Sequence, residues 1–242
     1  MSRILLIETA TEVCSAAIAV DGEVVAIEEE LHSLNHAALL TLQIDACVQA
    51  SGIPLAELDA VAVSRGPGSY TALRVGASVA KGICYALDKP LVAINTLLSL
   101  AWASREALLP NPQSLLPTPF FVPMLDARRQ EVWLAVFDAQ LREIVPEQPL
   151  VLENNLFENY ISQGIPRPEE TVLVIAGNGS QKLKNGTTRE NMVFSFIKNC
   201  SARHLSVLAE QFFQEAEFQN VAYFEPFYMK APNITTPSRA PF

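Results

Sequence analysis

The sequence predicts an α/β fold with two domains that share one design. Apolar, β-rich runs alternate with segments of helical periodicity along the chain. Two apolar runs separated by a short polar stretch open the chain, and the same order of features returns at residues 120–137. This return indicates an internal duplication. The stretch from Arg105 to Pro119 is rich in proline and typical of a linker, so we place the domains at 1–104 and 105–242.

A three-strand meander and a helix are predicted at the start of the chain. Strands are expected at 4–7, 15–20 and 23–30, with an Asp-Gly hairpin turn between the last two. Apolar residues then recur at helical spacing from His36 to Ala50. The meander should therefore be followed by an amphipathic helix.

The rest of the first half is predicted to contain a strand at 60–63, a helix at 70–87, a strand at 90–94 and a helix at 96–104. A tight turn at 65–68 precedes the first of these helices, and Ser69 is a good N-cap for it. The two strands should be parallel because a whole helix separates them.

The second half is predicted to contain strands at 120–125, 132–137, 172–176 and 192–196, and helices at 152–162 and 201–216. Its first two strands flank a polar stretch at 126–130, which matches the polar stretch at 8–12 in the first half.

Composition excludes several classes of protein. Half of the 242 residues are hydrophobic, which suits a globular chain with a substantial core. The chain shows no signal peptide and no apolar run of spanning length, so we expect a cytoplasmic protein with no membrane contact. Four scattered cysteines without a C-x-x-C pair indicate reduced thiols. A net charge of −9 argues against strong direct binding of nucleic acid, so a partner should hold any RNA.

Two carboxylates occupy matching places in the two halves. Glu8 ends the first strand of one hairpin and Asp126 ends the first strand of the other. Actin-like phosphotransferases hold magnesium and nucleotide with carboxylates in such places, on hairpin turns that usually need glycine. Here the turns are Thr9-Ala10-Thr11 and Ala127-Arg128-Arg129, without glycine. We therefore interpret Glu8 and Asp126 as a relic site and predict no cofactor.

Other motifs favour structural roles. The turn Arg65-Gly66-Pro67-Gly68 lacks the Gly-Lys end of a phosphate-binding loop, and its proline removes a backbone donor. Small residues at Ala72, Gly76 and Ala80 recur every fourth position, which indicates a face for close helix packing, internal or intermolecular.

The histidines do not predict a metal site. His32 and His36 have the spacing of a zinc pair, but His204 is the only other histidine and no Glu follows His32. No Ser-His-Asp or Cys-His arrangement can be identified, so the sequence predicts neither a metal nor a catalytic residue.

Three motifs together resemble the TsaB family in order and spacing. They are Ile7-Glu8-Thr9-Ala10-Thr11 with Cys14-Ser15, Arg65-Gly66-Pro67-Gly68-Ser69-Tyr70-Thr71 with Leu73-Arg74-Val75-Gly76, and Leu125-Asp126-Ala127-Arg128-Arg129 with Glu131-Val132. A closing segment, Glu225-Pro226 with Tyr228-Met229-Lys230, is similar too. The chain departs from the family at Glu8, where Asp is frequent, and at Ala72, where Gly is usual.

The resemblance implies a duplicated RNase H-like, or actin-like ATPase (ASKHA), fold and a non-catalytic role. TsaB-like chains take part in forming threonylcarbamoyladenosine in tRNA, with a TsaD-like subunit doing the transfer and a TsaE-like ATPase associated. They pair with TsaD or with themselves through two N-terminal-domain helices, which are 36–50 and 70–87 here. The implied partners are thus a TsaD-like catalytic subunit, a TsaE-like ATPase and, indirectly, tRNA; a homodimer stays open.

The implied interface comprises residues on these two helices, namely His36, Leu39, Leu40, Gln43, Tyr70, Leu73, Arg74, Gly76, Ala77 and Ala80. Ala80→Arg or Leu39→Glu is expected to break partner binding with little effect on folding, because either places charge in a desolvated interface.

Two enzyme classes remain as alternatives. An actin-like-fold phosphotransferase of the sugar or acetate kinase type requires glycine-lined phosphate turns, which the sequence lacks. A metallopeptidase, suggested by the family's old glycoprotease label, requires a zinc triad that three histidines do not provide.

Overall fold

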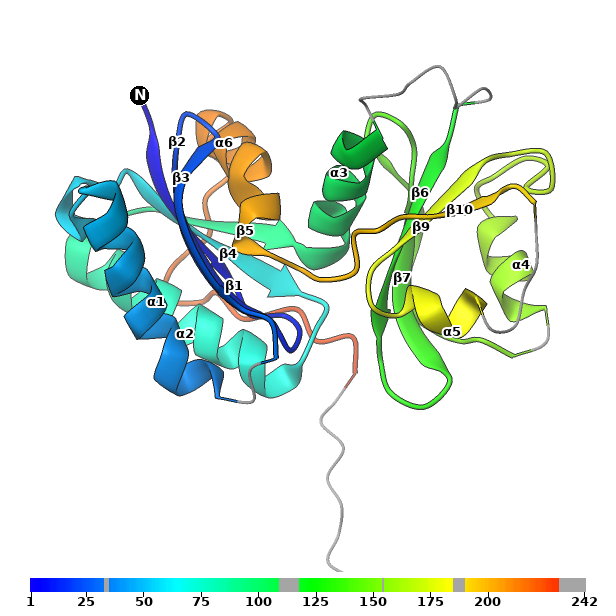
Figure 1. Cartoon of the computed structure of the whole chain (residues 1–242), viewed down its shortest axis with the longest axis horizontal. Coiled ribbons are helices and arrows are strands. Elements are labelled where there is room, and N and C mark those ends of the chain that lie inside the picture. The colour runs from blue at the N-terminus through cyan, green and yellow to red at the C-terminus, as the bar shows by residue number, and fades with distance from the viewer. Residues whose placement is uncertain (33–34, 109–117, 154, 185–189, 231–242) are drawn as a thin grey trace, which may run out of the picture.

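A computed structural model describes residues 1–32, 35–108, 118–153, 155–184 and 190–230. It contains two five-stranded mixed sheets with helices on their faces (Figure 1). The first sheet has the strand order β3-β2-β1-β4-β5 and the second the order β10-β9-β6-β7-β8. Read from the other edge, the second order is β8-β7-β6-β9-β10, which repeats the first strand for strand. The predicted duplication is confirmed, and the fold is the duplicated RNase H-like, actin-like α/β fold.

The first sheet consists of β1 (Arg3–Glu8), β2 (Cys14–Val20), β3 (Glu23–Glu30), β4 (Ala60–Gly66) and β5 (Leu91–Asn95). β1, β2 and β3 form the predicted antiparallel meander, and β4 and β5 continue the sheet as parallel strands. Asp21 and Gly22 join β2 to β3 with φ values of 49° and 81°. Both values lie in the left-handed region that a tight hairpin turn requires.

The helices of the first half are α1 (His36–Ser51), α2 (Tyr70–Leu87) and α3 (Thr96–Leu108), with a short 3-10 helix η1 (Leu55–Glu57) before β4. α1 and α2 cover one face of the first sheet: α1 packs on β2 and β3, α2 packs mainly on β4, and Leu40, Ile44 and Ala80 belong to the core between these helices and the sheet. α3 extends to Leu108, past the predicted boundary at 104. Most of the predicted linker, 109–117, lies outside the described residues, and the division into domains stays a prediction.

The second sheet consists of β6 (Phe120–Asp126), β7 (Glu131–Phe137), β8 (Glu143–Val151), β9 (Leu173–Ala176) and β10 (Met192–Phe194). Its helices are α4 (Leu156–Ile161) and α5 (Ser180–Lys184), followed by the 3-10 helix η3 (Ala202–Leu205) and α6 (Ser206–Gln214). β8 and α5 were not predicted. β8 was missed because Pro146 and Pro149 argue against a strand in the sequence. The structure accommodates both prolines because β8 is an edge strand, where proline is tolerated.

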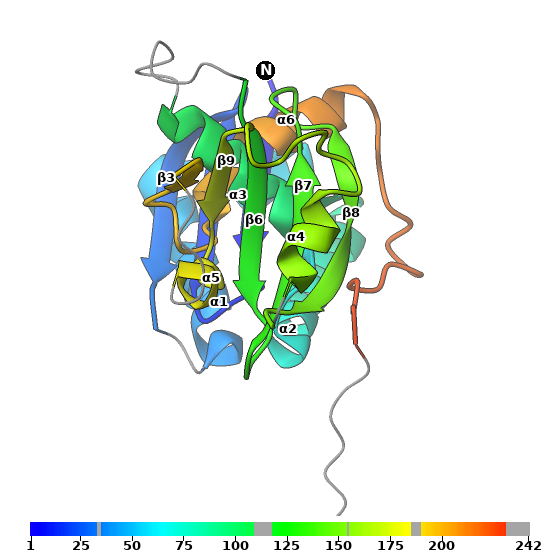
Figure 2. The same cartoon turned by 90° about the vertical axis from the view of Figure 1, so that its right-hand side faces the viewer.

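Between the two sheets, each sheet is covered in part by a helix from the other half of the chain. α3 lies between the sheets, where Leu97 and Leu100 pack against Phe121 of β6 (Figure 1). α6, from the end of the chain, covers the inner face of the first sheet, with Leu208 packed against Ile4. The view in Figure 2 shows α3 behind the second sheet and α4 in front of it. Each half thus supplies a helix to the core of the other.

No helix in the part of the chain that the structure describes is long and apolar enough to cross a membrane. All four cysteines are free and buried, as expected for reduced thiols.

Candidate functional site

The two predicted carboxylates lie at corresponding places in the two sheets. Glu8 is the last residue of β1 and Asp126 is the last residue of β6, and β1 and β6 are the equivalent central strands of the duplicated fold. The predicted matching of their positions is therefore confirmed. The surroundings of the two carboxylates differ, however.

Glu8 is completely buried. Its Oε1 accepts hydrogen bonds from the Ala10 backbone N–H at 2.6 Å and from the Ser64 hydroxyl at 2.8 Å. Its Oε2 has no hydrogen-bond partner among the described residues. Burial raises the pKa of Glu8 from 4.5 to about 7, although the bonds from Ala10 and Ser64 lower it. This carboxyl group is thus part of the core and keeps its proton to a higher pH than an exposed carboxyl group would.

Asp126 is partly exposed and already bound to a cation. Its Oδ1 accepts hydrogen bonds from Lys182 Nζ at 2.7 Å and from the Arg128 backbone N–H at 2.6 Å. Lys182 also donates to the Glu131 backbone carbonyl at 2.8 Å. The Lys182 ammonium group is therefore fixed between the Asp126 carboxylate and the β7 backbone. A magnesium ion bound by Asp126 would compete with this ammonium group for the carboxylate.

The turn between β6 and β7 is strained in a way that glycine would relieve. Arg128 and Arg129 have φ values of 69° and 50°, in the left-handed region that non-glycine residues rarely occupy. Such residues typically cost about 1–3 kcal/mol each and are enriched at functional sites. Two adjacent arginines thus stand where two glycines would be easier to accommodate.

The first hairpin turn is covered by the chain itself. The Ser69 backbone N–H donates to the Ala10 carbonyl at 2.7 Å, and Gly68 lies so close that any side chain there would collide with Ala10. The turn at 65–68 is therefore the structural turn that the sequence predicts, and its Gly66-Pro67 bond is cis. Ser69 is the N-cap residue of α2, as predicted, although its side chain makes no capping hydrogen bond.

These surroundings do not fit a magnesium–nucleotide site. Glu8 is inaccessible, Asp126 has Lys182 as its cation, and the two hairpin turns lack the glycines that allow phosphates to approach the backbone. The relic interpretation of Glu8 and Asp126 stays the preferred one.

The stripe of small residues on α2 packs inside the chain. Ala80 is fully buried, and any Cβ at Gly76 would collide with the Thr9 side chain, just after the end of β1. The close approach of α2 to the first sheet therefore depends on the missing side chain at Gly76, and the stripe is an internal packing face.

The ten predicted interface residues divide into two groups. Six are buried within the chain alone, namely His36, Leu40, Leu73, Gly76, Ala77 and Ala80. Leu39, Gln43 and Tyr70 are half-buried and Arg74 is exposed. Ala80→Arg cannot leave folding intact, because Ala80 packs in the core against β1 and β4, so that expectation was wrong. The interface itself stays a prediction.

The outer surface of α1 and α2 carries apolar residues that the prediction missed. Leu42 of α1 is 65% exposed and Tyr85 of α2 is 86% exposed. Periodicity could have identified Leu42, which lies off the buried stripe that ends at Cys47. Large apolar side chains with such exposure are candidates for contact with another protein.

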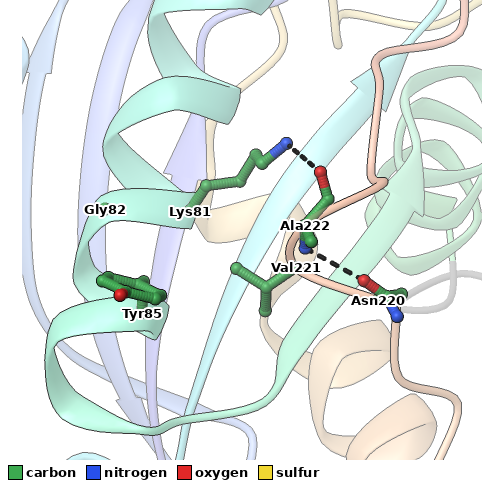
Figure 3. A pocket seen from close by; sticks show the side chains of 6 residues that line it. All are labelled: Lys81, Gly82, Tyr85, Asn220, Val221 and Ala222. Carbon is green, nitrogen blue, oxygen red and sulfur yellow. Dashed lines mark hydrogen bonds between the residues drawn. The ribbon is translucent and has the colours of Figure 1, made fainter.

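A pocket of about 650 Å³ lies beside Tyr85 (Figure 3). Lys81, Gly82 and Tyr85 of α2 line one side, and residues 220–222 line the other. Lys81 Nζ donates to the carbonyl oxygens of Ala222 at 3.2 Å and Phe224 at 2.9 Å, which fixes this part of the C-terminal segment against the helix. The pocket extends the exposed surface of α2.

The closing segment that resembles the TsaB family binds the start of α2. The Phe227 backbone N–H donates to the Arg65 carbonyl at 2.7 Å. The rings of Tyr228 and Tyr70 are 4.5 Å apart between centroids and tilted by 39°, and the Arg74 guanidinium lies 4.4 Å from the centroid of the Tyr70 ring. Two residues predicted for the interface, Tyr70 and Arg74, are thus already engaged in intramolecular contacts.

The histidines lie apart in three environments. His32 is exposed, and the His36 ring is buried with Nε2 3.3 Å from the Val13 carbonyl. Burial lowers the pKa of His204 to about 4, helped by the charge of Arg203. Among the described residues, no group of three or more His, Cys, Asp or Glu side chains could hold a metal ion.

Comparison with known proteins places these features in a family. The family model for TsaD, tRNA N6-adenosine threonylcarbamoyltransferase, matches residues 24–239. The tRNA threonylcarbamoyladenosine biosynthesis protein TsaB of Haemophilus influenzae is 29% identical, over 94% of this chain and 93% of its own length. The Escherichia coli protein of the same name is 26% identical over 94% of both.

Similarity to the transferases themselves is partial. The tRNA N6-adenosine threonylcarbamoyltransferase of Anaeromyxobacter dehalogenans is 36% identical over 40% of this chain and 34% of its own length. Among solved structures, YeaZ from Pseudomonas aeruginosa is 24% identical and superposes with a TM-score of 0.76, covering 94% of this chain and all of that one. This likeness shows the same fold.

Proposed function

Because this chain belongs to the TsaD family and, within it, to the TsaB-named proteins, we propose that it is a non-catalytic partner subunit that activates a TsaD-like transferase. It takes part in the biosynthesis of threonylcarbamoyladenosine in tRNA. The names of the relatives state only a part in this biosynthesis. The partner role is inferred from the surroundings of Glu8 and Asp126. A TsaE-like ATPase is the expected additional member of the complex.

The observation that carries the non-catalytic role is the state of the two carboxylates. Glu8 is enclosed in the core, and Asp126 is neutralised by Lys182 within the chain. Glu8 could not reach a magnesium ion without leaving the core, and Asp126 would have to exchange Lys182 for the ion. These contacts support a chain that has kept the fold and works through its surface.

The outer face of α1 and α2 is the surface best suited to the partner. Leu42 and Tyr85 are exposed apolar anchors on the two helices, and the pocket beside Tyr85 offers a recess for a partner side chain. Apolar and aromatic anchors that become buried supply most of the affinity of protein interfaces.

Co-purification with the TsaD-like protein of the same organism tests the proposed function. We expect a complex on size-exclusion chromatography, and we expect threonylcarbamoyl transfer to tRNA to require this chain. The chain alone should not turn over ATP. ATP turnover by the chain alone that Glu8→Ala abolishes would contradict the proposal in favour of a phosphotransferase.

The double variant Leu42→Glu, Tyr85→Glu is expected to weaken binding of the TsaD-like partner at least tenfold, which corresponds to about 1.4 kcal/mol. Two charges would be buried without partners in the interface, while the isolated chain would stay folded because both sites are exposed. Titration calorimetry measures the affinity and a thermal melt measures folding.

The matched control is Val193→Glu, which changes a partly exposed apolar residue on β10, in the other half of the chain. It should bind the partner like the unmodified chain. Undiminished binding by the double variant would show that the partner uses a different face.

A further inference from the structure

A group of basic side chains gathers at one end of the second sheet, although the whole chain carries a net charge of −9. We refer to it as the basic surface, and it comprises Arg128, Arg129, Lys182, Lys184, Lys198 and Lys230. The members come from the β6–β7 turn, from α5 after β9, from the segment after β10 and from the C-terminal segment. Strands β6, β9 and β10 are parallel neighbours, so their C-terminal ends lie together at this end of the sheet.

Contacts connect the segments that carry these side chains. Lys182 and the Arg128 backbone share Asp126 Oδ1, and Lys230 pairs with Glu131 at 2.5 Å. Lys198 donates to Ser180 Oγ at 3.0 Å, at the first residue of α5. Burial lowers the pKa of Lys198, and the charge of Lys184 lowers it further, as expected where two cations are close together.

Most of the charge on the basic surface has no carboxylate partner among the residues that the structure describes. Asp126 and Glu131 are its contacting carboxylates, and they pair with Lys182 and Lys230. Within the ranges that the structure describes, no carboxylate pairs with the side chains of Arg128, Arg129, Lys184 or Lys198, whereas Arg65, Arg105, Arg142 and Arg167 elsewhere each have one. Uncompensated cations close to one another repel, and a bound polyanion would relieve that repulsion.

The turn between β6 and β7 places two arginines at backbone positions that destabilise the folded chain, which suggests that their charge has a function. Arg128 and Arg129 project from adjacent left-handed backbone positions at the exposed tip of the hairpin. Arginine is suited to phosphate because its planar guanidinium donates several hydrogen bonds in a fixed geometry.

We propose that the basic surface binds the phosphate backbone of RNA, so that the chain itself makes a secondary contact with tRNA in the complex. The identity of the RNA rests on the proposed function, whereas the anion-binding surface rests on the charges alone. Backbone contacts of this kind position a substrate without reading its sequence. The main binding of tRNA stays with the partner, as the net charge of the chain predicts.

The test uses Arg128→Gly, Arg129→Gly, which removes both guanidinium groups and relieves the left-handed backbone. The melting temperature should therefore not fall. We expect weaker binding of labelled tRNA, by the chain alone and by its complex with the TsaD-like protein, in fluorescence anisotropy. A plot of log affinity against log salt concentration should become shallower by about two, or about one for each phosphate that the variant no longer neutralises.

Arg167→Gly is the matched control. Arg167 also has a left-handed backbone, with φ 51°, but it pairs with Glu170 and precedes β9, at the opposite end of that strand from Lys182. This variant should gain similar backbone relief and leave tRNA binding unchanged. Arg128→Lys, Arg129→Lys should restore most of the salt dependence, because the charges return.

Three outcomes would overturn the inference. Unchanged tRNA affinity and salt dependence in the glycine double variant would do so directly. Displacement of tRNA from the chain by millimolar inorganic phosphate or ATP, at constant ionic strength, would assign the surface to a small anion. Weaker binding of the protein partner with unchanged tRNA binding would assign it to an acidic protein. Assembly with the TsaD-like protein is scored separately, so failure of the proposed function would appear as a missing complex whatever the tRNA result.

Discussion

Ala80→Arg is expected to unfold the chain rather than to loosen a partner. Ala80 is fully buried where α2 packs on the first sheet, next to Val61 and Val63 of β4. An arginine there would have to bury an unpaired charge and force apart a close-packed helix and sheet. We expect a loss of about 4 kcal/mol or more in the free energy of unfolding, which is at the extreme of single substitutions. Urea denaturation followed by circular dichroism measures it.

Ser78→Arg supplies the control on the same helix. Ser78 is exposed, two residues before Ala80, so its substitution should change the free energy of unfolding by less than about 0.5 kcal/mol. If Ala80→Arg were as stable as Ser78→Arg, α2 would have to pack on the first sheet with a different face.

Glu8→Gln is expected to stabilise the protein above neutral pH. The pKa of Glu8 is about 7 in the folded chain and near 4.5 when unfolded, so between these values the folded state binds more protons. The free energy of unfolding therefore falls as pH rises from about 4.5 to 7, by roughly 3 kcal/mol, and stays at that lower level above pH 7. The introduced amide would keep an oxygen for Ala10 and Ser64 but would carry no charge.

The measurement is the difference in free energy of unfolding between Glu8→Gln and the unmodified chain, at about pH 5 and at about pH 8. We expect almost no difference at the lower pH and a gain of up to roughly 3 kcal/mol at the higher pH. The comparison must be differential because His204 acts in the opposite direction. Its pKa is lowered from 6.5 to about 4, so its contribution is present above about 6.5 and is lost as pH falls toward 4. A difference that is the same at both pH values would contradict the raised pKa of Glu8.

The sequence predicts the architecture well because its patterns are local. Periodicity identifies α1 and α2 almost to the residue, and the matching of Glu8 with Asp126 reveals the duplication that the strand orders confirm. The misses have physical causes. β8 contains two prolines on an edge strand, and α5 has five residues, which is too short for a helical period to be recognised.

The candidate site is harder to predict because its character depends on tertiary contacts. The sequence places Glu8 and Asp126 correctly, but not the burial of one and the pairing of the other with Lys182, 56 residues away along the chain. The sequence also suggests α2 as an interface helix without showing which face the first sheet occupies. Gly76 and Ala80 fit either interpretation until the contact with Thr9 is known.

The exchange of helices between the sheets bears on how such a chain is inherited. A fragment ending at residue 104 would carry most of α3 away from the sheet that it helps to cover and would lack α6, leaving Ile4 and Leu6 on an open apolar surface. Neither half is thus expected to fold alone if recombination moved it into another gene without the other half. The two halves of this molecule are free to diverge in surface and chemistry, as Glu8 and Asp126 have, but only while they remain together in one reading frame.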